Sequence, residues 1–169
     1  MIYPDNSELP QVFLTMGQVR ISKEPVVIST ILGSCISVTM FNHRTAIGGM
    51  CHGFLPHCRD AESCDKNPLD CFRFVDCSVS RMVEQFRAYS IAPKEIEVKM
   101  FGGANMFKGK LVANSRPSVG DQNVEAAKRA IADIGLKLAA FDVGGTSGRE
   151  ILFYAHTGRV LLRKTKKIV

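Results

Sequence analysis

Three apolar, β-branched runs follow one another in the first third of the chain, and they constrain the fold more than any other feature. The runs read VVISTIL at 26–32, CISVTMF at 35–41 and AIGGMCHGFL at 46–55. Runs of this composition and length are typical of buried strands. Because only the polar stretch NHRT at 42–45 separates the second run from the third, we expect these two runs to pair as a β-hairpin.

Two helices are expected further along the chain. Apolar residues at helical spacing predict the first over about 71–90, before a proline that forbids its continuation. The second is predicted over 119–135, with Asp121 or Asn123 as its N-cap and Gly135 at its C-terminal end.

Strand patterns alternate with these helices and decide the expected fold class. They occupy residues 95–103, 136–145 and 150–164, and an HTGR turn splits the last into a hairpin. Five or more strands and two long helices in mixed order predict an α+β fold, that is, an α/β sandwich of mixed β-sheets packed with two main helices. A length of 169 residues fits one domain. Within residues 1–169 we expect an irregular N-terminal segment at 1–20, an exposed loop at 57–70 and a basic tail at 163–169.

Composition and charge argue against several classes of protein. No apolar run approaches the roughly 18–20 residues that span a bilayer. The N-terminus lacks the basic and then apolar order of a secretory signal. We therefore expect a cytoplasmic protein without membrane insertion. The net charge is +6, partly gathered in the tail, but no recognition helix or RNA-binding aromatic pattern accompanies it, so nucleic acid is not an expected partner.

All six cysteines fall in one part of the sequence: Cys35, Cys51, Cys58, Cys64, Cys71 and Cys77. Disulfides are not expected, because the cytosol keeps thiols reduced. Structural zinc sites present cysteines two to four residues apart, and no spacing here does so, which argues against a metal. No cofactor is expected. Cys51 should point into the core, opposite to its neighbour His52, and His57 should be a solvated loop residue.

Cys35 and His52 are the pair that could carry chemistry. Cys35 follows Gly33 and Ser34 at the point where the strand pattern breaks, and His52 lies across the 42–45 turn from it. A cysteine nucleophile needs a nearby histidine that moves protons, and the expected hairpin brings these two positions toward each other. The alternative is that Cys35 is a small buried hydrophobe, as many unpaired cysteines are.

Four ordered blocks resemble a known family. LGSC at 32–35 is followed by a histidine 17 residues beyond its cysteine, and then come VKMFGGANMF at 98–107, VGDQN at 119–123 and DVGGTSGREILFYAHTGRVLLRK at 142–164. In this order they resemble the signature of CheD, the chemoreceptor glutamine deamidase of bacterial chemotaxis. The resemblance extends from about residue 26 to residue 164 and is weakest in the cysteine-rich stretch at 57–71.

The resemblance implies a protein-glutamine deamidase that acts on the cytoplasmic helices of methyl-accepting chemoreceptors. It also implies a fold like the cysteine–histidine catalytic domain of cytotoxic necrotising factor. By the match, Cys35 is the nucleophile and His52 the base. A hydroxyl upstream of the cysteine orients the histidine; Thr30 is preferred for this role, and Ser29 remains open.

Backbone N–H groups of the nucleophile turn, with Gly33 and Ser34 as candidates, are expected to hold the oxyanion of the reaction. The resemblance also leaves an alternative function, a non-catalytic module that docks on the chemotaxis phosphatase CheC and stimulates it.

Overall fold

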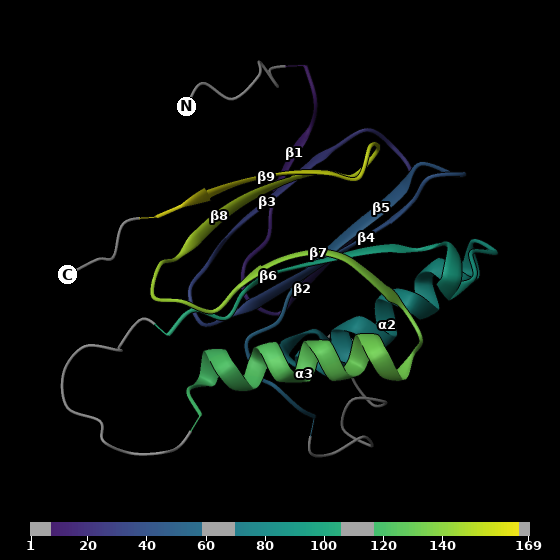
Figure 1. Cartoon of the computed structure of the whole chain (residues 1–169). Coiled ribbons are helices and arrows are strands. Elements are labelled where there is room, and N and C mark those ends of the chain that lie inside the picture. Colours follow the sequence, from purple (N-terminus) through teal and green to yellow (C-terminus); the bar gives the residue numbers. More distant parts are fainter. Residues whose placement is uncertain (1–7, 59–69, 106–116, 166–169) are drawn as a thin grey trace.

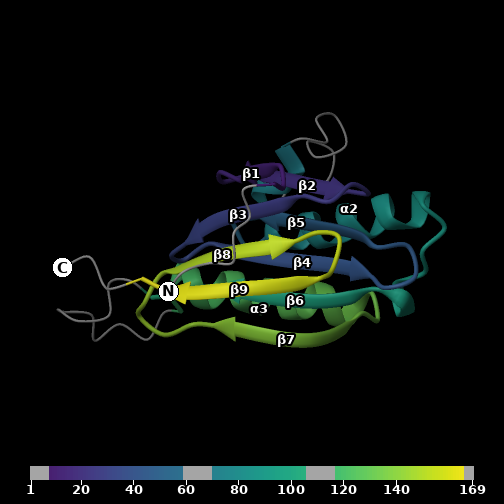
Figure 2. The ribbon, with the colours of Figure 1, turned by 90° about the horizontal axis from the view of Figure 1, so that it is seen from above.

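Two β-sheets lie face to face, and two helices cover the outer side of one of them (Figure 1). The computed structural model describes residues 8–58, 70–105 and 117–165. Figure 2, seen from above, shows the strands of the two sheets running over one another with the helices beneath. The resulting order of layers is a four-stranded sheet, a five-stranded sheet and a helical layer.

The four-stranded sheet has the order β1–β3–β8–β9, with the bounds Gln11–Phe13, Val27–Leu32, Arg149–Tyr154 and Arg159–Lys164. The five-stranded sheet has the order β2–β5–β4–β6–β7, with the bounds Gln18–Ser22, Ile47–His52, Ile36–Asn42, Glu97–Gly102 and Lys137–Val143. The helices are α2 at Val75–Ala88 and α3 at Val119–Asp133, and short 3-10 turns occur at Asp70–Arg73 (η1) and Pro93–Glu95 (η2). Strand β1 pairs with β3 and β6 with β7 in parallel, and the other pairings are antiparallel. The predicted α+β fold of mixed sheets and two main helices is therefore confirmed.

The predicted β-hairpin is confirmed as β4 and β5, which pair in antiparallel register on both sides of the 43–46 turn. Its two strands are fully buried, because the sheet they belong to is covered on both faces. Met50 packs in the core between the two sheets, and its neighbour Cys51 packs in the core beneath the helices. This alternation confirms the orientation expected of Cys51, whose pKa burial raises to about 11.

The N-terminal segment corrects the sequence interpretation. Residues 1–20 were expected to be irregular, but β1 and most of β2 fall inside them. A proline at the start of a strand lacks only an N–H donor. The carbonyl of Pro10 still accepts a hydrogen bond from the Val27 N–H at 2.9 Å, so Pro10 leads into β1 instead of preventing it.

Two further expectations are corrected at element ends. Ser118 is the N-cap of α3, because its hydroxyl accepts the N–H of Asp121 and its own N–H donates to the Asp121 carboxylate; Asp121 completes the cap and Asn123 has no part in it. The expected basic tail begins inside β9, where Arg163 pairs with Glu150. Most of the expected loop at 57–70 lies outside the described residues, and so does Cys64. In the described part of the chain, no helix is long and apolar enough to cross a membrane.

Candidate active site

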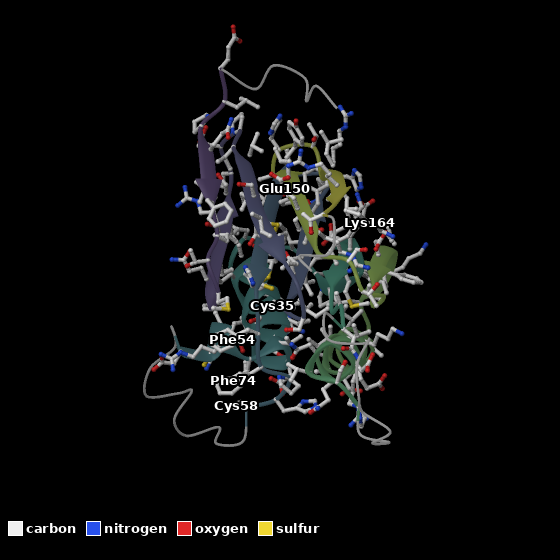
Figure 3. The ribbon with its side chains drawn as sticks, turned by 90° about the vertical axis from the view of Figure 1, so that its left-hand side faces the viewer. Cys35, Phe54, Cys58, Phe74, Glu150 and Lys164 are labelled. Atoms are coloured by element: carbon white, nitrogen blue, oxygen red, sulfur yellow. The ribbon has the colours of Figure 1, made fainter. Side chains whose placement is uncertain are left out.

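Cys35 lies in the short turn that leaves β3 of the four-stranded sheet and enters β4 of the five-stranded sheet. The turn thus passes from one layer to the other. Figure 3 shows Cys35 between the four-stranded sheet, which carries Glu150, and the helical side, toward which Phe54 lies. The Cys35 side chain is partly buried and packs against the core between the two sheets.

His52 shares a face of the sheet with Cys35. Ile36 and Gly53 exchange both backbone hydrogen bonds at 2.9 Å, which makes them a directly opposed antiparallel pair. Cys35 precedes one member of this pair and His52 precedes the other. Because side chains alternate along a strand, both point to the face opposite to that of Ile36, which packs beneath the helices. Cys35 and His52 therefore meet as diagonal neighbours on the side between the sheets.

Thr30 contacts the imidazole from the facing sheet. Its Oγ1 lies 2.7 Å from Nδ1 of His52, and the same hydroxyl lies 2.7 Å from the carbonyl oxygen of Leu14. A carbonyl only accepts, so the single hydroxyl proton is donated to Leu14 and Oγ1 accepts from the Nδ1–H of His52. Of the two hydroxyls that the sequence left open, the structure brings Thr30 to His52, whereas its neighbour Ser29 points to the opposite face of β3.

The protonated Nδ1 leaves Nε2 of His52 as the basic nitrogen. This atom is buried and has no hydrogen-bond partner within the described residues. Burial lowers the pKa of His52, an effect that a backbone contact with Leu14 partly offsets. Burial also raises the pKa of Cys35. Both shifts favour the uncharged forms of the thiol and the imidazole.

The three carbonyls of the turn at 33–35 all accept hydrogen bonds. The Gly33 carbonyl accepts from the Ala104 N–H at 2.8 Å, and the Cys35 carbonyl accepts from the Gly103 N–H at 2.8 Å. Between them, the Ser34 carbonyl accepts from the Asn123 side-chain amide at 3.0 Å. In a trans peptide the N–H points away from its carbonyl. The N–H groups of Ser34 and Cys35 thus point away from the donors that hold the Gly33 and Ser34 carbonyls. Within the described residues, neither N–H donates to a backbone carbonyl.

Three parts of this site were not identified from the sequence. Leu14 carries no side-chain signal, because only its backbone contributes. Asn123 was interpreted as a helix cap, although it is fully buried. Gly102 falls in the strand pattern at 95–103 without a role of its own, yet a Cβ there would lie 2.1 Å from the Cys35 carbonyl oxygen, so glycine is required for this close approach.

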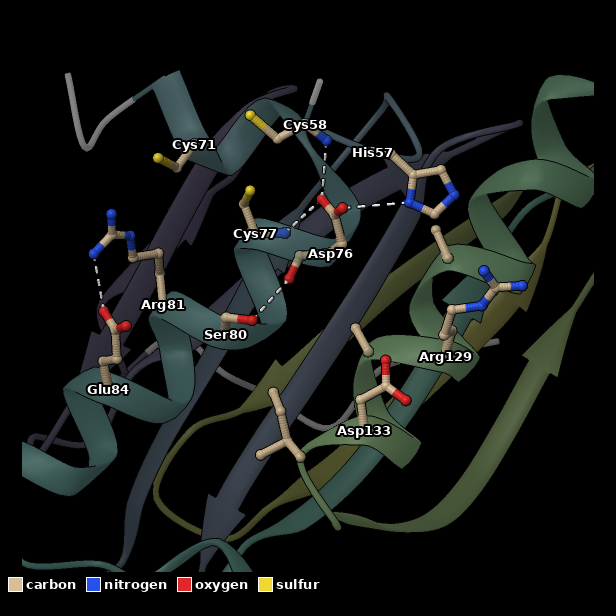
Figure 4. Close-up of a pocket in the computed structure, with 13 residues that line it drawn as sticks. His57, Cys58, Cys71, Asp76, Cys77, Ser80, Arg81, Glu84, Arg129 and Asp133 are labelled. Atoms are coloured by element: carbon tan, nitrogen blue, oxygen red, sulfur yellow. Dashed lines mark hydrogen bonds and ion pairs between the residues drawn. The ribbon is translucent and has the colours of Figure 1, made fainter. Parts of the chain in front are cut away.

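The other thiols lie elsewhere. Cys58, Cys71 and Cys77 line a separate cavity of about 500 Å³ between α2 and α3 (Figure 4). His57 is half exposed at the rim of this cavity, where its Nδ1 lies 3.3 Å from a carboxylate oxygen of Asp76. Across residues 8–58, 70–105 and 117–165, no three His, Cys, Asp or Glu side chains form a group that could hold a metal ion.

Comparisons with known proteins give a consistent picture. Residues 54–164 match the family model described as CheD chemotactic sensory transduction. The chain is 42% identical over 160 residues to a probable chemoreceptor glutamine deamidase CheD 2 of Geobacter sulfurreducens, covering 95% of this chain and 93% of that protein. It is 35% identical over 169 residues to a probable chemoreceptor glutamine deamidase CheD of Maridesulfovibrio salexigens, covering 97% and 98%.

Two more distant matches complete the comparison. A probable chemoreceptor glutamine deamidase CheD of Thermococcus kodakarensis is 34% identical over 155 residues, covering 91% of this chain and 92% of that protein. Among solved structures, the Bacillus licheniformis hypothetical protein YfiH matches with a TM-score of 0.49 at 10% identity, covering 86% of this chain and 64% of that one.

Proposed function

The chain belongs to the CheD family, and from this premise we propose that it is a chemoreceptor glutamine deamidase in which Cys35 is the nucleophile and His52 the general base. The reaction is the hydrolysis of a glutamine side-chain amide to glutamate and ammonia. Chemoreceptor glutamines are the substrate class, because the curated relatives that cover nearly the whole chain carry that activity in their names. The cytoplasm, where the signalling helices of such receptors lie, is the proposed location.

One observation carries the assignment of roles, namely the chain of hydrogen bonds from His52 through Thr30 to the Leu14 carbonyl. It fixes the imidazole in the tautomer whose Nε2 accepts a proton, on the face where the Cys35 thiol lies. A thiol with a raised pKa is a poor nucleophile until a base removes its proton. The position of His52 on the same face as Cys35 supports its assignment as that base.

The reaction then proceeds as an acyl transfer to the Cys35 thiol. Nε2 of His52 takes the thiol proton as Sγ of Cys35 attacks the amide carbon of the substrate. The backbone N–H groups of Ser34 and Cys35 are the donors that face the resulting oxyanion; the first was among the expected candidates, and the Cys35 N–H is favoured here over that of Gly33. His52 returns the proton to the departing ammonia, and a glutamyl thioester remains. Water activated by His52 hydrolyses this thioester to glutamate and restores the thiol.

The test is incubation with a chemoreceptor cytoplasmic fragment, followed by mass spectrometry of its glutamine-containing peptides. The wild-type protein should convert amide to acid at specific glutamines, and Cys35→Ala should convert none. Cys77→Ala is the matched control, since it removes a thiol that lines the separate cavity, and it should retain activity. Conversion by Cys35→Ala at the wild-type rate would show that the nucleophile is another group.

Docking on the phosphatase CheC stays a prediction. The proposed site is complete in Cys35, His52 and Thr30, which is what catalysis requires, so the enzymatic function is the one that we adopt.

A further inference from the structure

We propose that Asn123 is a positioning residue that turns the peptide between Ser34 and Cys35 so that the Cys35 N–H faces the substrate oxyanion. The inference rests on the proposed function and adds to it a residue that does not touch the substrate. By this inference, a residue on the buried face of α3 sets the orientation of the backbone next to the nucleophile.

Asn123 is buried and makes two hydrogen bonds that link distant parts of the chain. It is 0% exposed, and its Nδ2 donates to the Ser34 carbonyl at 3.0 Å and to the Phe54 carbonyl at 3.2 Å. Two acceptors identify this end of the amide as the nitrogen. Because the cap of α3 is formed by Ser118, Asn123 has no role in starting the helix.

Asn123 and the Cys35 thiol approach the turn from opposite sides. Helix α3 covers the outer face of the five-stranded sheet, whereas the Cys35 side chain packs on the inner face, between the sheets (Figures 1 and 3). The Ser34 carbonyl is drawn toward α3 by the Asn123 amide. The N–H of the same planar peptide belongs to Cys35, and it must therefore point to the inner face, where the thiol and the imidazole lie.

The second hydrogen bond of Asn123, to the Phe54 carbonyl, connects the same side chain to the segment that follows His52. Phe54 comes two residues after His52, and its own N–H donates to the carbonyl of Arg73 at 3.0 Å. One amide group thus spans the turn that carries the nucleophile and the segment that follows the base. A site held in this way is preorganised, because neither peptide needs to reorient when the oxyanion forms.

The chemistry of the amide explains why asparagine is required. Aspartate has nearly the same shape but cannot donate when ionised, and it would place a carboxylate against two carbonyl oxygens. Alanine removes both donors and leaves the two carbonyls buried without partners. In either variant the peptide between Ser34 and Cys35 loses its anchor and is free to rotate.

The experiment compares deamidation with alkylation of the same thiol. Iodoacetamide alkylation of Cys35 requires the thiolate but no oxyanion donor, so a misdirected N–H slows deamidation without slowing alkylation. We measure kcat and KM on a receptor fragment, together with the alkylation rate of the peptide that contains Cys35. For Asn123→Ala and Asn123→Asp, kcat should fall about 10²–10³-fold, the cost of losing one oxyanion donor. KM and the alkylation rate should stay at their wild-type values.

Asn42→Ala is the matched control. Asn42 is also buried and its Nδ2 also donates to a carbonyl, that of Glu95 at 2.9 Å, but it lies at the far end of β4 from Cys35. This variant should lose stability without losing kcat. If Asn123→Ala does not fold, Asn123→Asp, which keeps the shape of the side chain without its donors, carries the test under the same criteria.

Two results would overturn the inference. One is an Asn123 variant with wild-type kcat. The other is a parallel fall of kcat and alkylation, which would reduce Asn123 to general packing. Activity that persists in Cys35→Ala would instead overturn the proposed function, so the two failures are distinguishable.

Discussion

Oγ1 of Thr30 lies 2.7 Å from Nδ1 of His52, and the only proton of that hydroxyl is already donated to the carbonyl of Leu14. The two residues come from different sheets, so the contact depends on the way the sheets face each other. It determines which nitrogen of the imidazole is basic. A site that relied on rotation of a mobile histidine would have no such constraint.

Thr30→Val removes this contact at nearly constant volume. Without an acceptor for Nδ1–H, the imidazole loses its fixed tautomer and orientation, and we expect kcat to fall about a hundredfold, within the range attributed to general acid–base catalysis. Thr30→Ser keeps the hydroxyl and should restore most of the activity. Steady-state kinetics on a receptor fragment measures both.

Ser29→Ala is the control for this series, because it removes the adjacent hydroxyl on the opposite face of β3. It should retain wild-type kcat. An equal loss in Ser29→Ala and Thr30→Val would show that disturbance of the strand, and not the contact with His52, is responsible.

The pH dependence of activity follows from the directions of the two pKa shifts. Burial lowers the pKa of His52, so the imidazole stays neutral, and able to accept the thiol proton, to a pH below its ordinary value of about 6.5. The acidic limb of kcat/KM should therefore fall below pH 6.5. A limb centred above that value would contradict a buried neutral base.

The pKa of the Cys35 thiol is shifted in the opposite direction, upward. Burial raises the pKa of Cys35, so alkylation of its peptide should still increase with pH above the ordinary thiol value of about 8.5. A plateau of the alkylation rate near neutral pH would indicate a preformed thiolate–imidazolium pair instead.

The sequence predicted those features that depend on neighbouring residues. Composition and a short turn were enough for the β4–β5 hairpin, which was expected to bring Cys35 and His52 toward each other. Strand β1 was missed because it has only three residues and its pairing with β3 is not local. Asn123 was misinterpreted because a polar residue near a helix start looks the same whether it caps the helix or binds a carbonyl 89 residues away.

Gly102 permits the close approach of β6 to the turn that carries Cys35. Its φ is +112°, and an added Cβ would lie 2.1 Å from the Cys35 carbonyl oxygen, which is backbone and cannot rotate away. We expect Gly102→Ala to displace this carbonyl from the Gly103 N–H and to lower kcat more than tenfold, since small misplacements at a reacting group are costly.

Gly135→Ala separates this effect from backbone strain. Gly135 also has a positive φ, +75°, but an added Cβ there would meet nothing within 4 Å. That variant should lose about 1–2 kcal/mol of stability from the left-handed conformation alone and keep its kcat. Equal kcat in the two variants would show that the contact at Gly102 does not position Cys35.

Arg149 lies on β8, an inner strand of the four-stranded sheet, and connects it from a buried position to β7, an edge strand of the other sheet. It is 3% exposed, and its guanidinium donates to the carboxylate of Asp142 on β7 at 2.7–2.8 Å and to the carbonyls of Gly144 and Ser147 at 2.8 and 3.0 Å. The planar group has five N–H donors in a fixed arrangement, which a lysine ammonium cannot reproduce. The link therefore depends on arginine and not on positive charge alone.

Arg149→Ala should lower the free energy of unfolding by about 1.5–3 kcal/mol, the contribution of hydrogen bonds to a charged group, because Asp142 is one-third exposed and keeps its ion pair with Lys164. Arg149→Lys should recover only part of this loss, because it restores the positive charge without the fixed planar set of N–H donors. Urea denaturation measures both, with Arg159→Lys on the exposed side of β9 as the control that leaves the midpoint unchanged. A midpoint for Arg149→Lys equal to that of the wild type would mean that charge alone connects β8 to β7, and that the hydrogen bonds to the carbonyls of Gly144 and Ser147 add nothing to stability.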